Sequence, residues 1–128
     1  MRPLLLACVL VACGKPEPMP PKRPNTELIV GEFARRPPVG TTAARFRGDG
    51  SVVVAHDEKE LDTKPLATGR FSLDGDKLTL TYTSGEMCPA GVEGVYTVVI
   101  SKVGIRFTKV DDNCERRAKM DGETWYRL

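Results

Sequence analysis

The chain has 128 residues, with 19 Lys or Arg against 17 Asp or Glu, so its formal net charge is only +2. Such a balanced mixture of charges gives no argument for binding to nucleic acid or to an acidic substrate. The basic pairs Arg35-Arg36 and Arg116-Arg117 are too short to change this, and we expect them on the solvated surface. No nucleic-acid partner is therefore predicted.

Residues 1–12 have the pattern of a secretion signal. A positive charge precedes an apolar run at residues 4–10, which is far shorter than the roughly 20 residues that a membrane-spanning helix needs. The stretch Leu10-Val11-Ala12-Cys13 resembles the lipobox of bacterial lipoproteins. The resemblance implies that residues 1–12 are cleaved and that Cys13 is lipidated, which makes the membrane a predicted partner. Because Gly14 rather than Asp follows, the resemblance to enteric lipoproteins favours the outer membrane of the cell envelope.

A tether is predicted to follow the lipidated cysteine, over residues 13–26. Residues 14–26 hold five prolines and show no apolar periodicity, which favours an extended polyproline II conformation. At about 3.1 Å per residue, the segment can hold a domain up to roughly 40 Å from the membrane. Residues 27–128 then form one domain, which is large enough for one hydrophobic core.

The pattern of this domain alternates between apolar and polar residues, as in half-buried β-strands. Leu78, Leu80 and Tyr82 show it most clearly, and the same period recurs elsewhere, in residues 44–47, 70–73, 95–100 and 105–108. Three short turn segments separate such runs: Gly48-Asp49-Gly50, Asp74-Gly75-Asp76 and Val103-Gly104. Gly and Asp tolerate the positive φ of tight hairpins.

The domain then has about eight strands, which come from three hairpins, a first strand near 27–33 and a last strand near 124–128. A series of antiparallel strands with short connections closes best as an up-and-down barrel, which leaves no free sheet edge. The predicted fold is therefore all-β, a small antiparallel up-and-down barrel. An eight-stranded barrel is just wide enough to be filled by side chains or to hold one small ligand.

Two of the connections are longer. The segment 57–65 is charged, and we expect it to be mobile. The segment 112–121 lacks β-branched residues, so a short helical turn is predicted near 113–120, with Asp112 as its cap.

The four cysteines divide by position. Cys8 leaves with the signal peptide and Cys13 takes the lipid, so Cys88 and Cys114 remain in an exported chain. Export to an oxidising compartment predicts a disulfide between them, which is worth roughly 3–4 kcal/mol in the chain-entropy model. Metal ligation or a catalytic thiol is the alternative, but a single cysteine pair with one distant His does not match zinc spacing.

Several residues together resemble the lipocalin-like (calycin-like) domains of exported bacterial proteins. The pattern is made of an Asp-Gly turn, a Cys, a Gly-x-Tyr, a Gly turn, an Asp-x-Cys-x-x-Arg and a late Trp. It is found here at Asp74-Gly75, Cys88, Gly94 with Tyr96, Gly104, Asp112 with Cys114 and Arg117, and Trp125. In lipocalins a Gly-x-Trp of the first strand packs against an Arg near the last strand. Here Gly31-Glu32-Phe33 has Phe at the Trp position, and Trp125 and Arg127 lie on the last strand, so the resemblance implies fold more than ligand.

Asp112 and Arg117 are the most specific candidates for a site. They are either a structural brace closing one end of the barrel or part of a binding rim, and Arg suits multidentate contacts in both roles. His56, with Asp57, Glu58 and Glu60, is more typical of a solvated loop than of a metal or acid–base site. No catalytic residue, metal site or cofactor is predicted.

Six aromatic residues fall on the predicted strands. They either pack as plain core or line an apolar cavity, and they are Phe46, Phe71, Tyr82, Tyr96, Phe107 and Trp125. The sequence as a whole predicts a membrane-anchored, non-enzymatic module that binds a small apolar ligand or an envelope protein. The alternative is an inhibitor of an envelope hydrolase that inserts a loop, either 57–65 or 84–91.

Overall fold

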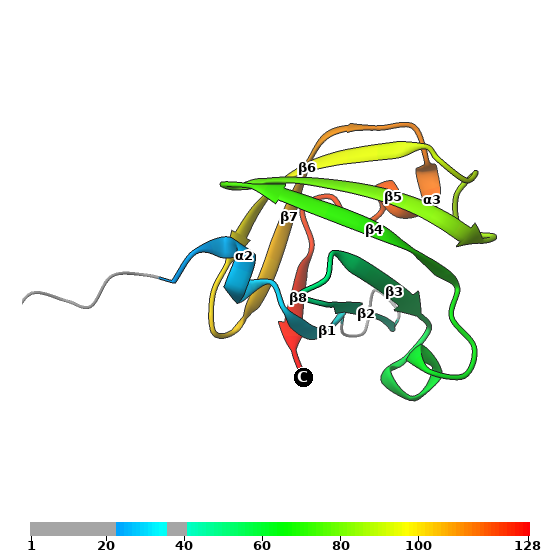
Figure 1. Cartoon of the computed structure of the whole chain (residues 1–128), viewed down its shortest axis with the longest axis horizontal. Helices are drawn as coiled ribbons and strands as arrows, with labels where there is room; N and C mark the ends of the chain where they lie inside the picture. The colour runs from blue at the N-terminus through cyan, green and yellow to red at the C-terminus, as the bar shows by residue number, and fades with distance from the viewer. Residues whose placement is uncertain (1–22, 36–40) are drawn as a thin grey trace, which may run out of the picture.

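The computed structural model describes residues 23–35 and 41–128, which form a closed antiparallel barrel (Figure 1). Its strands are β1 (Gly31–Arg35), β2 (Thr42–Phe46), β3 (Ser51–Ala55), β4 (Ala67–Asp74), β5 (Lys77–Gly85), β6 (Glu93–Ile100), β7 (Gly104–Asp112) and β8 (Thr124–Arg127). Each strand pairs with the next along the chain, and β8 returns to pair with β1. The predicted up-and-down barrel of eight strands is therefore confirmed. The lipobox, Cys13 and most of the predicted tether lie outside the described residues.

The two ends of the barrel differ in the length of their connections. At the turn end, β2–β3, β4–β5 and β6–β7 are joined by the three predicted hairpins, and Gly75 has the expected positive φ of 62°. Gly104 was predicted to be a turn residue, but it is the first residue of β7 and does not have a positive φ. A Cβ at this position would overlap the carbonyl oxygen of Trp125 on the neighbouring strand, so the glycine permits a close approach of β7 and β8.

The first strand begins later than predicted. Residues 25–28, the last two of the predicted tether among them, form a single helical turn, α2 (Asn25–Leu28), and β1 begins only at Gly31. Asn25 Nδ2 donates to the carbonyl oxygen of Gly75, which fixes α2 at the turn end. The late start of β1 is explained by Ile29, which directly follows the helix. Its side chain is buried at the turn end of the barrel, so the chain enters the core before the strand begins.

The core follows the period of two along each strand. Inward-facing residues of all eight strands form one buried cluster, which includes Phe33, Phe46, Leu80, Tyr96, Phe107 and Trp125. Neighbouring rings meet edge to face, as aromatic pairs prefer, with centroids 5.8 Å apart for Phe107 and Trp125. Arg127 of β8 lies over the ring of Phe33 in β1, 4.7 Å from its centroid. This contact has the strand positions that the lipocalin resemblance implies, with Phe33 in place of Trp.

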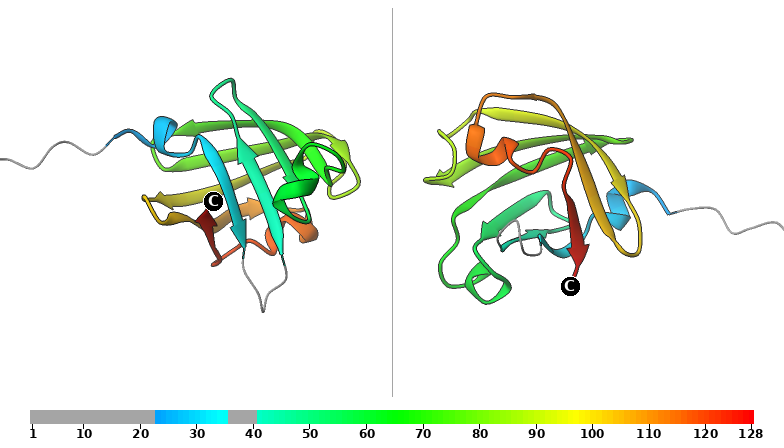
Figure 2. Two further views of the ribbon diagram at one scale, coloured as in Figure 1. Left: turned by 90° about the horizontal axis from the view of Figure 1, so that it is seen from below. Right: turned by 180° about the vertical axis from the view of Figure 1, so that it is seen from behind.

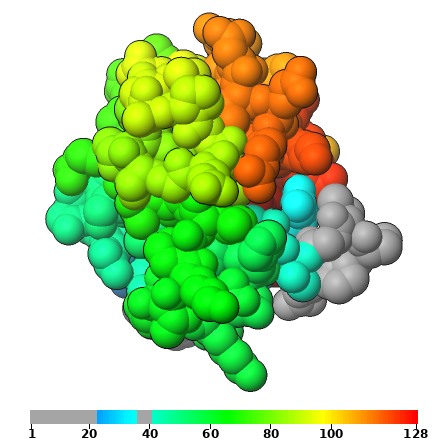
Figure 3. Space-filling view, turned by 90° about the vertical axis from the view of Figure 1, so that its right-hand side faces the viewer, coloured from blue at the N-terminus to red at the C-terminus, as the bar shows by residue number. Residues whose placement is uncertain are grey.

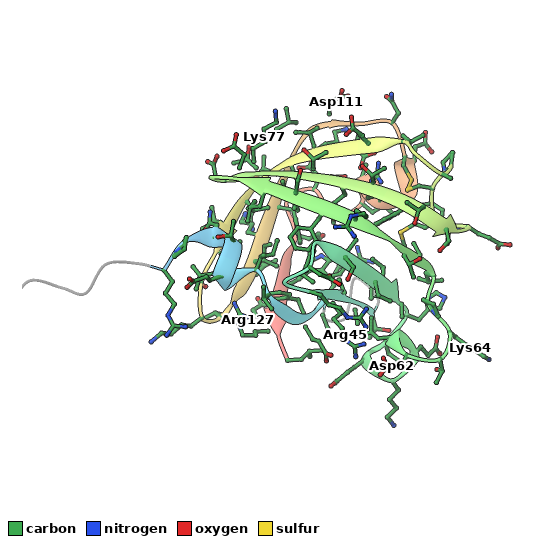
Figure 4. The ribbon with its side chains drawn as sticks, viewed as in Figure 1. Arg45, Asp62, Lys64, Lys77, Asp111 and Arg127 are labelled. Atoms are coloured by element: carbon green, nitrogen blue, oxygen red, sulfur yellow. A yellow bond between two sulfur atoms is a disulfide. The ribbon has the colours of Figure 1, made fainter. Side chains whose placement is uncertain are left out.

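The segment 57–65, which was expected to be mobile, is folded back on the barrel. It contains the short helix η1 (Glu58–Leu61), and Leu61 is buried against Ala43, Val53 and Ala55 on the outer face of β2 and β3. Arg45 donates to Asp62 at 2.6 Å and to Glu32 at 2.7 Å (Figure 4). Leu61 is the one apolar side chain of this charged run, and its burial anchors the whole connection.

A β-bulge in β7 changes which side chains face inward. The register of β6 and β7 shifts between Val95 and Tyr96, so that Gly94 lies opposite Asp112. Side chains alternate along a strand, so Phe107 and Asp112 can face the same side only if one extra residue lies between them. The bulge supplies that residue and directs Asp112 into the barrel.

Candidate ligand pocket

The longer connections meet at the end of the barrel opposite α2, which we call the open end. They are the segments 56–66, 86–92 and 113–123, and the last contains the short helix α3 (Glu115–Ala118). Figure 2 shows α2 and α3 at opposite ends of the barrel, and Figure 3 looks onto the open end. The helical turn predicted near 113–120 is present, but Asp112 does not cap it as expected. Its Oδ1 accepts instead from the backbone N–H of Cys114, which precedes the helix.

A disulfide ties two of these connections together. Cys88 and Cys114, the predicted pair, are joined, with Cα atoms 5.6 Å apart, and both residues are buried. The bond closes a separation of 26 residues. It fixes the segment 86–92 against the start of α3, which positions everything that α3 carries.

A buried ion pair lies next to the disulfide. Arg117 donates from Nε to Oδ2 of Asp112 at 2.7 Å and from Nη2 to Oδ1 at 2.9 Å, and neither side chain is exposed. The Tyr96 hydroxyl also donates to Oδ2, and Arg117 Nη2 reaches the carbonyl oxygen of Val92 at 3.0 Å. Both carboxylate oxygens are thus doubly hydrogen-bonded. The ion pair that the sequence offered as a brace is present, in bidentate geometry.

The ion pair shifts the pKa values of its members. Burial disfavours the charged form of Asp112, but the hydrogen bonds from Arg117, Tyr96 and the Cys114 N–H outweigh it and lower the pKa of the carboxyl. Burial likewise disfavours the Arg117 cation, yet the bonds and charge of Asp112 raise its pKa. Burial, followed by the hydrogen bond to Asp112, raises the pKa of Tyr96. Asp112 and Arg117 are therefore both charged at neutral pH.

Gly94 makes room for the ion pair. A Cβ at this position would overlap Oδ2 of Asp112 and would lie 2.7 Å from Arg117 Nε. Residues that carried the family resemblance therefore contact one another in one network at the open end. They are Gly94, Tyr96, Asp112, Cys114 and Arg117. Their spacing in the sequence is explained by this one buried network.

A pocket of about 160 Å³ opens beside this network. Its apolar wall is made of Val54, Leu66, Met87 and Met120, together with the rings of Tyr82 and Trp125. Its basic lining is Arg35, Arg116, Arg117 and Lys119, and Thr42 and the exposed His56 complete it. No Asp or Glu belongs to this lining in the part of the chain that the structure describes. The pocket thus combines an apolar wall with an excess of positive charge.

Three buried nitrogen atoms of pocket-lining side chains have no hydrogen-bond partner among the described residues. They are Arg35 Nε, Arg117 Nη1 and Trp125 Nε1. Arg117 is only 2% exposed and Trp125 only 5%. The Arg117 guanidinium lies 4.9 Å from the centroid of the Tyr82 ring, and that of Arg35 lies 5.9 Å from the centroid of Trp125. Buried polar groups are normally hydrogen-bonded, so three unpartnered donors in one pocket require an explanation.

The structure divides the six candidate aromatics. Tyr82 and Trp125 line the pocket, whereas Tyr96 and Phe107 pack in the buried core and Phe46 packs edge to face on the half-buried Phe71. The expectation that both basic pairs are solvated is wrong for Arg117, which is buried, and for Arg35, which is half-buried.

Sequence reasoning missed Arg35, Arg116, Lys119 and the two methionines as pocket residues. The available signal was the cluster Arg116-Arg117-Ala118-Lys119-Met120, in which basic and apolar residues alternate within a helical turn. Arg35 had no local signal, because only closure of the barrel brings β1 to the same end as α3.

The described residues contain no group of three or more His, Cys, Asp or Glu side chains that could hold a metal ion. Within the same residues, no helix has the length and apolar character needed to span a membrane. No protein-family model matches the sequence, and comparison with curated proteins and with solved structures finds no match. The pocket is therefore the feature from which function is inferred.

Proposed function

We propose that this protein is a lipid-anchored module of the bacterial cell envelope whose barrel, of the lipocalin-like kind, binds a small ligand at its open end. The observation that carries the proposal is the pocket, in which an apolar wall meets four basic side chains and which includes buried donors without partners among the described residues. Concave apolar sites with a few directed polar groups are typical of ligand binding. Catalysis would need a positioned nucleophile or acid–base pair, and the proposal therefore assigns binding without turnover.

The size of the pocket limits the ligand. An engineered cavity of about 150 Å³ in another protein binds benzene, whereas typical drug-sized ligands occupy roughly 300–1,000 Å³. A volume of about 160 Å³ therefore suits a body of about six carbon atoms. Most of the barrel interior is filled by the aromatic core, so ligands of the size that large lipocalins hold have no room in it.

The position of the N-terminal segment supports a defined orientation. The described chain begins at Arg23 beside α2, at the turn end, and the pocket lies at the opposite end (Figure 1). A lipid on Cys13 would attach the barrel through its turn end. In this proposal the pocket then faces away from the membrane, toward ligands in the aqueous space.

The binding proposal can be tested with a built-in probe, because Trp125 is the single tryptophan of the chain and lines the pocket. We expect small molecules from a screen that spans charge and polarity to change its emission in a saturable way. Leu66→Phe, which fills the pocket, should abolish the change. Leu73→Phe, a matched change in the same strand region at the turn end, should preserve it. A screen without any saturable response, or a response that persists in Leu66→Phe, would contradict the proposal.

The anchor has its own test. Cys13→Ser should prevent lipid labelling and release the chain from the membrane fraction or leave it as an uncleaved precursor. Retention of a lipid label in that variant would exclude Cys13 as the anchor.

The inhibitor alternative has no specific support from the described residues. Leu61 and Asp62 hold the segment 57–65 against the barrel wall, and Cys88 holds the segment 84–91. Both loops are therefore ordered, and nothing in the described residues identifies an enzyme that either loop would enter.

A further inference from the structure

The charge of the pocket is not compensated on its ligand side. Of the basic residues that line it, Arg117 has a carboxylate partner, Asp112, and this pairing uses Nε and Nη2 alone. Asp112 has no capacity left for a second cation, because each of its oxygens already accepts two hydrogen bonds. Arg117 therefore lines a site whose other charged lining residues, Arg35, Arg116 and Lys119, have the same sign.

The unpartnered atoms all lack the same kind of partner. Arg and Trp side chains carry donors and no acceptor, so Arg35 Nε, Arg117 Nη1 and Trp125 Nε1 can be satisfied only by an acceptor. A cation or a ligand with donors alone would leave them unpaired. An anionic oxygen would satisfy them with charge-assisted bonds, which are stronger than neutral ones. The donors call for an acceptor, and the uncompensated positive charge of the lining favours an anionic acceptor over a neutral one.

The apolar wall decides what the anion is attached to. A phosphate or sulfate ion would present oxygen on every side, and some of it would lie against Val54, Leu66 and the two methionines without a donor. A single carboxylate has its charged oxygens at one end and leaves the remaining volume to carbon. We propose that the pocket selects a small monocarboxylate with a compact apolar body of about six carbon atoms, an inference that rests on the proposed binding function.

Isothermal titration of the full chain in a non-ionic detergent tests this selectivity with three probes. Benzoate carries the anion and the apolar body, benzamide carries the same body with an uncharged carbonyl acceptor, and inorganic phosphate carries the anion alone. We expect benzoate to bind at least tenfold more tightly than either of the others, since a hydrogen bond to a charged group contributes roughly that factor or more.

The choice of variants avoids Arg117, whose loss is expected to destabilise the fold. Arg35→Gln removes one pocket charge, so it should weaken benzoate binding about tenfold and leave benzamide unchanged. Arg70→Gln removes the same charge from an exposed arginine near the β2–β3 turn, at the other end of the barrel, and should leave both unchanged. This control separates local contacts from the effect of net charge.

Each contrary outcome has a distinct meaning. Benzamide that binds as tightly as benzoate would overturn the anion requirement while the binding function stands. Phosphate that binds as tightly as benzoate would overturn the requirement for an apolar body. If no probe binds although the Trp125 screen finds other ligands, the monocarboxylate assignment is wrong and the binding function holds. If no probe binds and the screen is also silent, both proposals fail.

Discussion

Replacing Arg117 with Ala should cost about 3 kcal/mol of the free energy of unfolding. Removing one partner from a buried ion pair typically costs 3–5 kcal/mol, because the remaining charge is left buried without compensation. Both side chains here are fully buried, which places the change in this class. Asp112 would retain the Tyr96 hydroxyl and the Cys114 N–H, so we expect the lower end of the range.

Urea unfolding at pH 7 with the disulfide intact measures this change. With a slope of about 2 kcal/mol/M, a loss of about 3 kcal/mol lowers the midpoint by roughly 1.5 M. Arg116→Ala is the matched control, because Arg116 is exposed and makes one hydrogen bond, to the carbonyl oxygen of Glu86. Its effect should stay within about 0.5 kcal/mol. If the Arg117→Ala midpoint falls no further than that of Arg116→Ala, the buried pair does not stabilise the open end.

Three further predictions concern the same end of the barrel. Gly94→Ala should lower the free energy of unfolding in urea by about 1–3 kcal/mol, because the added Cβ overlaps Asp112. Gly48→Ala, whose added Cβ meets no atom within 4 Å, should lower it far less. Equal losses of stability in the two variants would refute the steric argument. Replacing Cys88 and Cys114 together with Ala should lower stability by about 3–4 kcal/mol in thermal melts, and two free thiols in the exported wild-type chain would show that the bond is absent. Because its folded-state pKa is lowered, Asp112 contributes stability that is complete above about pH 4 and is lost as the pH falls through the lower folded value. The unfolding free energies of wild type and Asp112→Asn should therefore differ by a constant amount between pH 7 and pH 5 and begin to converge below about pH 4. A gap that widens as the pH falls would contradict the lowered pKa of Asp112.

The fold could be predicted because its strands carry clear local signals. Leu78, Leu80 and Tyr82 alternate with polar residues and are all buried, and the Asp-Gly turn after β4 sets the register of its hairpin. Two of the three short helical turns, α2 and η1, carry no comparable signal. Each is held by one buried side chain, Ile29 or Leu61, whose burial depends on a surface formed by distant strands.

The candidate site could be predicted in part. The cysteine count and export predicted the disulfide of Cys88 and Cys114, and Asp112 with Arg117 suggested an ion pair; both are present. The bulge near Val95 could not be predicted, although it is what directs Asp112 inward. The pocket itself is a product of closure, since it needs β1, β8 and α3 at one end, and no local pattern records that arrangement.

The network and the pocket depend on each other through one side chain. Asp112 fixes one edge of the Arg117 guanidinium, and because the group is planar Nη1 is then held in a set direction. A rigid donor loses little conformational freedom when a ligand arrives, which favours affinity. Leaving a buried donor without any acceptor costs about 1–3 kcal/mol. A bound carboxylate that accepts from such a donor would avoid that cost and stabilise the fold by mass action. The disulfide and the buried ion pair stabilise the end of the barrel at which this ligand is proposed to bind.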